Sequence, residues 1–121
     1  MARVQDARSY DIVLVSDQQM RVLGGDDPNT LITRRDIARA MRQQGQCVRA
    51  EEKFREVLAA QIRVLGADNQ STLITSYEIA WVMADRRDFT GAETEFRNVF
   101  AAWLRVLGPD HPTTLATRRG V

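Results

Sequence analysis

A row of arginines is the first feature of this sequence that could do chemistry. Three of them recur at i, i+4 and i+7, the spacing of side chains along one stripe of a helix: Arg35, Arg39 and Arg42. The guanidinium group is always charged and presents planar pairs of N–H donors, so such a row can hold carboxylates or phosphates through forked hydrogen bonds. The row therefore predicts a binding surface for acidic groups.

A second stripe further along the chain offers apolar and aromatic surface. It consists of Ile74, Tyr77 and Trp81, with Asp85 at its end. Tyrosine and tryptophan recur at the energetic centres of protein interfaces. Lying side by side, the two stripes would hold a peptide with an acidic residue next to an apolar or aromatic one. Two simpler interpretations stay open: Arg39 stacks on Trp81 as a structural cation–π contact, or the arginines only face solvent.

No set of residues indicates catalysis or a cofactor. The one histidine, His111, lies in "GPDHPTT", a composition typical of turns. The one cysteine, Cys47, has no histidine near it in the sequence, which predicts a buried apolar thiol and not a nucleophile. One histidine and one cysteine also leave no conventional set of metal ligands. We therefore expect a protein that is not an enzyme and that has no cofactor and no metal site.

Charge and hydropathy argue against nucleic acids and membranes as partners. The formal net charge is +1, so no overall field draws the chain to DNA or to a lipid surface. A repeat protein that reads bases needs the reading residues in every unit, whereas here the arginines of one stripe give way to Ile, Tyr and Trp. No apolar run is long enough to span a membrane, and the N-terminus lacks the apolar core of a secretory signal. These features predict a cytoplasmic protein whose partner is a protein or a peptide.

The candidate residues sit in a repeated framework. The lines "RVLGGDDPNTLITRR", "RVLGADNQSTLITSY" and "RVLGPDHPTTLATRR" begin at Arg21, Arg63 and Arg105, which are 42 residues apart. Apolar spacing predicts a helix over 30–44 and a longer one over 47–65, and the same pair recurs at 71–86 and 89–107. Within the repeated line, we expect glycine to end one helix, aspartate to shape the turn, and threonine to cap the next helix. The threonines in question are Thr30, Thr72 and Thr114.

Each unit is thus a helical hairpin, and a single domain spans 1–121. It divides into a half repeat at 1–25, full repeats at 26–67 and 68–109, and a partial repeat at 110–121. A half unit at each end would leave apolar helix faces without a partner. Two alternatives follow: the chain self-associates through its terminal helices, most simply as a homodimer, or it is a fragment of a larger multidomain regulatory protein.

One tryptophan departs from the pattern of the repeat. Trp103 takes the place of Gln19 and Gln61, a position that we expect to face solvent. A large aromatic side chain there would mark a contact patch or would cover the end of the stack. Either interpretation predicts that Trp103 is buried against something.

Small and aromatic residues recur at fixed places in both full units. They are Ala38, Gly45, Ala50 and Phe54 in the first and Ala80, Ala92 and Phe96 in the second, where Arg87 stands in the place of Gly45. With the 42-residue period and the linker "LGPDHPTTLATR", the chain resembles tetratricopeptide repeats of the kinesin-light-chain type. The resemblance implies an all-α, right-handed solenoid of antiparallel helical hairpins. It also implies a scaffold for protein–protein contacts through the concave face that the first helices line, and it implies no reaction.

Overall fold

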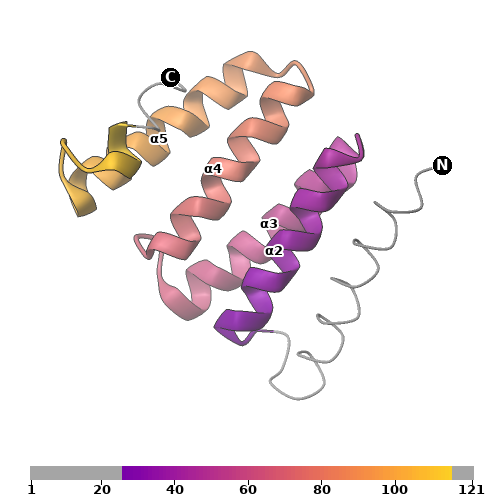
Figure 1. Cartoon of the computed structure of the whole chain (residues 1–121), viewed down its shortest axis with the longest axis horizontal. Coiled ribbons are helices and arrows are strands. Elements are labelled where there is room, and N and C mark those ends of the chain that lie inside the picture. The colour runs from indigo at the N-terminus through magenta and orange to yellow at the C-terminus, as the bar shows by residue number, and fades with distance from the viewer. Residues whose placement is uncertain (1–25, 116–121) are drawn as a thin grey trace.

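A computed structural model describes residues 26–115, which are helical and contain no strand. Four helices follow one another: α2 (Pro28–Gln43), α3 (Cys47–Leu65), α4 (Gln70–Asp85) and α5 (Phe89–Leu107) (Figure 1). The expected helices are confirmed, with ends shifted by at most two residues. A further helical turn begins at 112. The opening half repeat, 1–25, and the end of the partial repeat, 116–121, lie outside the described residues, so the terminal half units stay predictions.

Side chains that accept hydrogen bonds from free backbone N–H groups start the first helix of each hairpin. Asp27 accepts from the N–H of Asn29 at the start of α2 (2.9 Å), and Asn69 occupies the same place before α4. The expectation that threonines cap these helices is wrong. Thr30 and Thr72 already lie inside the first turn, where their side chains are buried in the core.

The turns within hairpins and the linkers after them contain backbone conformations that favour glycine. Gly66 and Gly108 end α3 and α5 with φ of 92° and 91°, and Gly45 has φ of 84° in the turn after α2. The residue equivalent to Gly45 in the second hairpin is Arg87, which adopts φ of 68°. A left-handed conformation costs a residue with a Cβ about 1 kcal/mol. The second hairpin therefore turns at a strained residue.

An ion pair recurs in both hairpins and explains part of the repeated line. Arg63 contacts Asp26 at 2.5 Å, and Arg105 contacts Asp68 at 2.7 Å. In each case the end of the second helix is tied to the residues that precede the first helix of the same hairpin. All four side chains are largely exposed, so each pair adds little to the free energy of unfolding. The arginine and aspartate of the repeated line are thus architectural.

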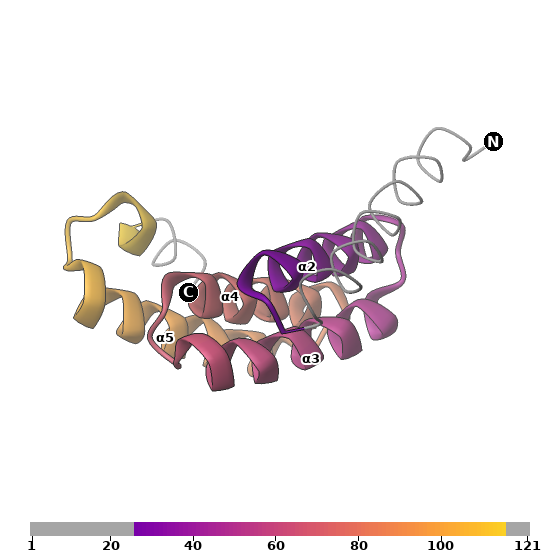
Figure 2. The same cartoon turned by 90° about the horizontal axis from the view of Figure 1, so that it is seen from below.

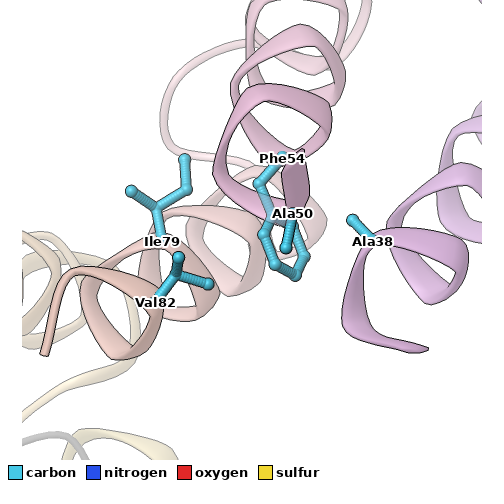
Figure 3. Packing of buried hydrophobic residues seen from close by; sticks show 5 residues of the cluster. All are labelled: Ala38, Ala50, Phe54, Ile79 and Val82. Carbon is cyan, nitrogen blue, oxygen red and sulfur yellow. The ribbon is translucent and has the colours of Figure 1, made fainter. Parts of the chain in front are cut away.

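The main core lies where the first hairpin meets the second. Phe54 and Ala50 of α3 are fully buried between Ala38 of α2 and the pair Ile79 and Val82 of α4 (Figure 3). Alanine at positions 38 and 50 lets the helices approach closely, and the ring of Phe54 fills the space between them. A second cluster repeats the motif with Ala80, Ala92 and Phe96.

The hairpins stack so that helices of one kind share a side. Each helix packs against the next helix in the chain, and α2 also contacts α4. The first helices, α2 and α4, form one layer, and α3 and α5 form the other (Figure 2). This arrangement is the expected all-α solenoid of helical hairpins. It brings the two candidate stripes onto neighbouring helices of the same layer.

Candidate binding surface on the first helices

The two predicted stripes meet along the line where α2 lies beside α4, which we call the α2–α4 seam. Its predicted members are Arg35, Arg39 and Arg42 on α2 and Ile74, Tyr77, Trp81 and Asp85 on α4. Arg39 donates through Nε and Nη2 to the two carboxylate oxygens of Glu78, at 3.3 and 3.1 Å. Arg42 donates through Nε to Asp85 at 2.6 Å. The arginines therefore join one hairpin to the next.

Arg35 is the least accessible of the three arginines. Its side chain is buried, and its Nη1 donates to the backbone carbonyl of Ser71 at 3.3 Å. Its Nε has no hydrogen-bond partner. Burial lowers the pKa of Arg35 from its ordinary value, and the nearby charge of Arg39 lowers it further. Arg35 thus fastens α2 to the start of α4 and offers little surface to a ligand.

Aromatic rings continue the seam on α4. Tyr77 packs against Trp81, Phe96 and Trp103, with ring centroids 6.1, 5.6 and 5.7 Å apart. Trp81 also meets Phe96 edge to face at 5.1 Å. These are the separations at which aromatic pairs attract one another. Tyr77 and Trp81 are half-buried, so each keeps part of its ring available to a partner.

The apolar member at the start of the stripe packs inward. Ile74 is half-buried against the cluster of Leu73, Val99 and Trp103. This cluster lies inside the second hairpin, between α4 and α5. Ile74 therefore extends the apolar surface of the seam while supporting the rings next to it.

The cation–π contact involves a different arginine from the one expected. The guanidinium carbon of Arg42 lies 6.0 Å from the centre of the Trp81 ring, whereas Arg39 is held by Glu78. The interpretation that Arg39 stacks on Trp81 is therefore wrong. The bidentate pair with Glu78 fixes the guanidinium group of Arg39 on that carboxylate instead. The second simple interpretation, of arginines that only face solvent, is also wrong for these paired side chains.

Arg42 is the arginine of the seam with hydrogen-bonding capacity to spare. Arg39 uses Nε and Nη2 on Glu78, and its Nη1 lies 3.5 Å from Asp36. Arg42 uses only Nε, in the bond to Asp85, which leaves both of its Nη amino groups for another acceptor. Its side chain is 26% exposed. Arg39 is more exposed, at 37%, but its guanidinium group is engaged by Glu78 and Asp36, so Arg42 is the arginine of the row that combines unused donor groups with a place over an aromatic ring.

Sequence reasoning missed Glu78 and Asp36, and with them the charge balance of the seam. Three arginines face three carboxylates, those of Asp36, Glu78 and Asp85, so the seam is close to neutral. The 42-residue period could have predicted these partners. First helices of stacked hairpins run side by side, so a residue of α2 meets residues near its own position plus 42. Glu78 lies 39 positions after Arg39, and Asp85 lies 43 after Arg42.

The position of Trp103 does not face solvent. Trp103 is 2% exposed and its counterpart Gln61 is fully buried, so the expected solvent-facing site is wrong. Gln61 accepts a hydrogen bond from Thr75 on α4 at 2.5 Å. Trp103 fills the equivalent space with its ring against Tyr77, and its backbone carbonyl accepts from Thr114 at 3.4 Å. Trp103 is therefore a core residue and offers no contact patch.

The remaining reactive side chains serve the architecture. His111 is exposed, and its Nδ1 accepts from the N–H of Thr113 at 3.1 Å, which agrees with a role in the turn. Cys47 is half-buried and less enclosed than expected. It packs at the edge of the Phe54 cluster, the buried group of Ala38, Ala50, Phe54, Ile79 and Val82. Within residues 26–115, no group of three metal-ligating side chains comes together. None of the helices described is both long and apolar enough to cross a bilayer.

Antiparallel helical hairpins that repeat every 42 residues and stack on one another define the class of helical-repeat proteins. Two adjacent stretches, 30–71 and 72–113, match the family model for the tetratricopeptide repeat, and each is 42 residues long. The chain belongs to the tetratricopeptide repeat family. Arrays of this family are generally protein–protein interaction modules and are typically not catalytic.

Solved structures support the more specific resemblance. The chain is similar to a putative kinesin light chain from Podosopora anserina with nearly identical tetratricopeptide-like repeats, at 25% identity and a TM-score of 0.83. The match covers 93% of this chain and 54% of the other. A variant of the same protein matches equally well, over 93% and 53%. This chain spans about half the length of these relatives. No curated protein matches it.

Proposed function

We propose that the chain is a non-enzymatic scaffold that binds a peptide segment of a partner protein along the α2–α4 seam. The observation that carries this proposal is the pairing of Arg42 with Trp81. A charged group with two unused N–H donor groups stands over the ring of a half-buried tryptophan. Such a pair offers a carboxylate and an apolar side chain adjacent places on one surface.

The proposed ligand carries an acidic residue next to an apolar or aromatic one. Its carboxylate accepts from the Nη groups of Arg42, and its apolar side chain covers the exposed part of Trp81 and Tyr77. Because Asp85 already holds the Nε of Arg42, the ligand shares this arginine with an internal competitor. A nucleic acid is disfavoured, since its phosphates would meet the three carboxylates of the seam.

The test uses two pools of labelled eight-residue peptides, one with a fixed Glu–Leu pair and one with Gln–Leu in its place. Fluorescence polarisation should show tighter binding of the Glu pool. Arg42→Gln should weaken that binding about fivefold, the loss of one partly exposed charge-assisted contact. Arg97→Gln is the matched control, because Arg97 is an exposed arginine on α5, outside the seam. Equal affinity of both variants for the Glu pool would refute the proposal.

A gain of affinity gives a sharper test than a loss. Asp85→Asn keeps the shape of the side chain but removes the carboxylate that competes for Arg42. We expect this variant to bind the Glu pool about two- to threefold more tightly, with no change for the Gln pool. Weaker binding in Asp85→Asn would contradict the assignment of Arg42 as the anchor. Circular dichroism of each variant checks that the fold is retained.

A further inference from the structure

Two buried polar side chains, Arg35 and Gln61, belong to one polar cluster where α2, α3 and α4 come together. Arg35 lies on α2 and is 8% exposed, and Gln61 lies on α3 and is fully buried. Both are bonded to the first turns of α4. Arg35 donates through Nη1 to the carbonyl of Ser71 at 3.3 Å, and Thr75 donates to Oε1 of Gln61 at 2.5 Å. The hydroxyl of Thr75 also lies 3.2 Å from the Ser71 carbonyl, so the four residues form a continuous cluster.

This cluster contains two buried donors that no acceptor satisfies. Among residues 26–115, neither Nε of Arg35 nor Nε2 of Gln61 has a hydrogen-bond partner. The carboxylates of Asp36 and Glu78 are close enough to attract the guanidinium group of Arg35, but their ion pairs are with the next arginine of the row. An unpaired donor is costly in the protein interior, and a buried charge without a bonded counter-ion is costlier. The cluster therefore calls for an acceptor, and a negatively charged one fits best.

The second hairpin shows how the equivalent place is filled without such donors. Tyr77 and Trp103 stand 42 positions after Arg35 and Gln61, and their rings are in contact, with centroids 5.7 Å apart. The indole N–H of Trp103 is also unpartnered, but it is neutral. The side chains of arginine and glutamine together have several heavy atoms fewer than those of tyrosine and tryptophan, although protein interiors are packed to a similar density throughout. A small additional group beside the polar pair would make up this difference.

We propose that Arg35 and Gln61 together bind a small inorganic anion, chloride, inside the junction of α2, α3 and α4. The ion accepts from Nε of Arg35 and from Nε2 of Gln61, and its charge neutralises the buried guanidinium group. An anion suits the cluster better than water does, because a water molecule also needs acceptors for its own hydrogens. The acceptors next to the two donors, the Ser71 carbonyl and Oε1 of Gln61, are already in use.

This site is separate from the proposed peptide-binding surface. A peptide carboxylate is expected at Arg42, whose side chain is 26% exposed, whereas Arg35 is too enclosed to admit a peptide. Because the anion would lie between α2, α3 and α4, it would stabilise the contact of the first hairpin with the second. The experiments below contain no peptide, so the two proposals can fail separately.

The first test compares chloride with an anion that is too large to enter the junction. Urea unfolding of the full chain is measured in sodium chloride and in sodium gluconate, both at about 0.2 M, so that ionic screening is the same. A ligand that binds only the folded chain shifts the equilibrium toward it, and chloride should lower the equilibrium constant of unfolding about fivefold. Identical unfolding in the two salts would overturn the proposal.

Substitutions at the two donors separate a bound ion from a general effect of salt. Gln61→Glu supplies Arg35 with a carboxylate in place of the ion, so the difference between the salts should disappear. The double variant Arg35→Tyr with Gln61→Trp should also lose it and should stay folded, because the same pair is accommodated at 77 and 103. Arg97→Gln, at an exposed arginine, should keep the fivefold difference. An undiminished difference in the double variant would contradict the proposal.

Crystallography locates the ion. Bromide replaces chloride in such sites and scatters X-rays anomalously, so crystals of the full chain grown in sodium bromide should show an anomalous peak in contact with Nε of Arg35 and Nε2 of Gln61. Electron density at this place without an anomalous signal would mean a water molecule and would overturn the proposal. So would a Gln61 amide turned to donate to Thr75, or a bromide peak without any chloride effect in solution, which is binding at crystal concentration only.

Discussion

Arg87 is the residue whose backbone conformation suits its side chain least. It takes the left-handed place that Gly45 holds in the first hairpin, with φ of 68°. Replacing Arg87 by glycine removes the cost of the left-handed conformation, and this gain exceeds the loss from the greater conformational entropy of glycine in the unfolded chain. We therefore expect Arg87→Gly to raise the free energy of unfolding by about 0.5 to 1 kcal/mol, measured by urea titration.

The reverse exchange supplies the control for this residue. Gly45→Arg should lower the free energy of unfolding by a similar amount, since φ of 84° is strained for any residue with a Cβ. No atom lies within 4 Å of a Cβ added at Gly45, so crowding does not complicate the comparison. A decrease in both variants would show that the backbone conformation is not the deciding term.

Three arginines of equal type and regular spacing take three different roles. Arg35 is buried at the start of α4, Arg39 donates through Nε and Nη2 to Glu78, and Arg42 bonds Asp85 through Nε and keeps its Nη groups unused. Spacing along α2 predicted that they share a stripe, and they do. Their roles depend on which α4 residue lies opposite each of them, and spacing within one helix carries no information about that.

Between elements, Glu51 joins α3 to the end of α4. Burial alone would raise the pKa of Glu51, but hydrogen bonds from Arg55 and Arg86 outweigh it and lower the pKa below its ordinary value. A lowered pKa in the folded state stabilises the fold above the pKa of the unfolded chain, near 4.5. This stabilisation is lost as the pH falls through the lower pKa of the folded state.

The variant Glu51→Gln measures this contribution. At pH 7 we expect it to unfold about 1 kcal/mol more easily than the wild type, the size of a partly exposed ion-pair network. The difference should shrink as the pH falls below 4.5 and through the pKa of folded Glu51. Glu93→Gln is the matched control, because Glu93 has only its own-helix arginine, and its difference should be small throughout. A difference for Glu51→Gln that grows on acidification would contradict the assigned pKa direction.

The helices and their order could be predicted from the sequence because apolar and small residues recur at equivalent positions every 42 residues. Ala38 and Phe54 predicted the close packing that Figure 3 shows. The predicted burial of Trp103 is confirmed, but the expectation that its position faces solvent was wrong because it rested on the polarity of the equivalent glutamine, and Gln61 is buried and bonded to Thr75. Polarity predicts exposure poorly wherever a neighbouring helix supplies the hydrogen-bond partner.

At the scale of the whole molecule, stability depends on the junction between hairpins as well as on each hairpin. Repeat arrays behave as units coupled to their neighbours, and a weak interface lets the units unfold separately. Here the coupling runs through the Phe54 cluster, which takes residues from α2, α3 and α4. The ion pairs of the α2–α4 seam, Arg39 with Glu78 and Arg42 with Asp85, also couple the two hairpins.

Ile79→Ala should uncouple the two hairpins. Ile79 is 1% exposed and meets Phe54 across the junction, so its truncation should cost about 3 kcal/mol and weaken the interface itself. Both tryptophans, Trp81 and Trp103, lie in the second hairpin, so their fluorescence reports its unfolding alone, while circular dichroism reports all helices. In urea the two signals should coincide for the wild type and separate for Ile79→Ala.

Leu31→Ala separates loss of coupling from loss of stability. Leu31 is fully buried with Val57 and Ala60 inside the first hairpin, away from the junction cluster. Its truncation should cost a similar free energy, about 3 kcal/mol, yet leave the fluorescence and dichroism transitions together because the interface is intact. Separated transitions in Leu31→Ala, or coincident ones in Ile79→Ala, would mean that the Phe54 cluster is not what makes two hairpins unfold as one.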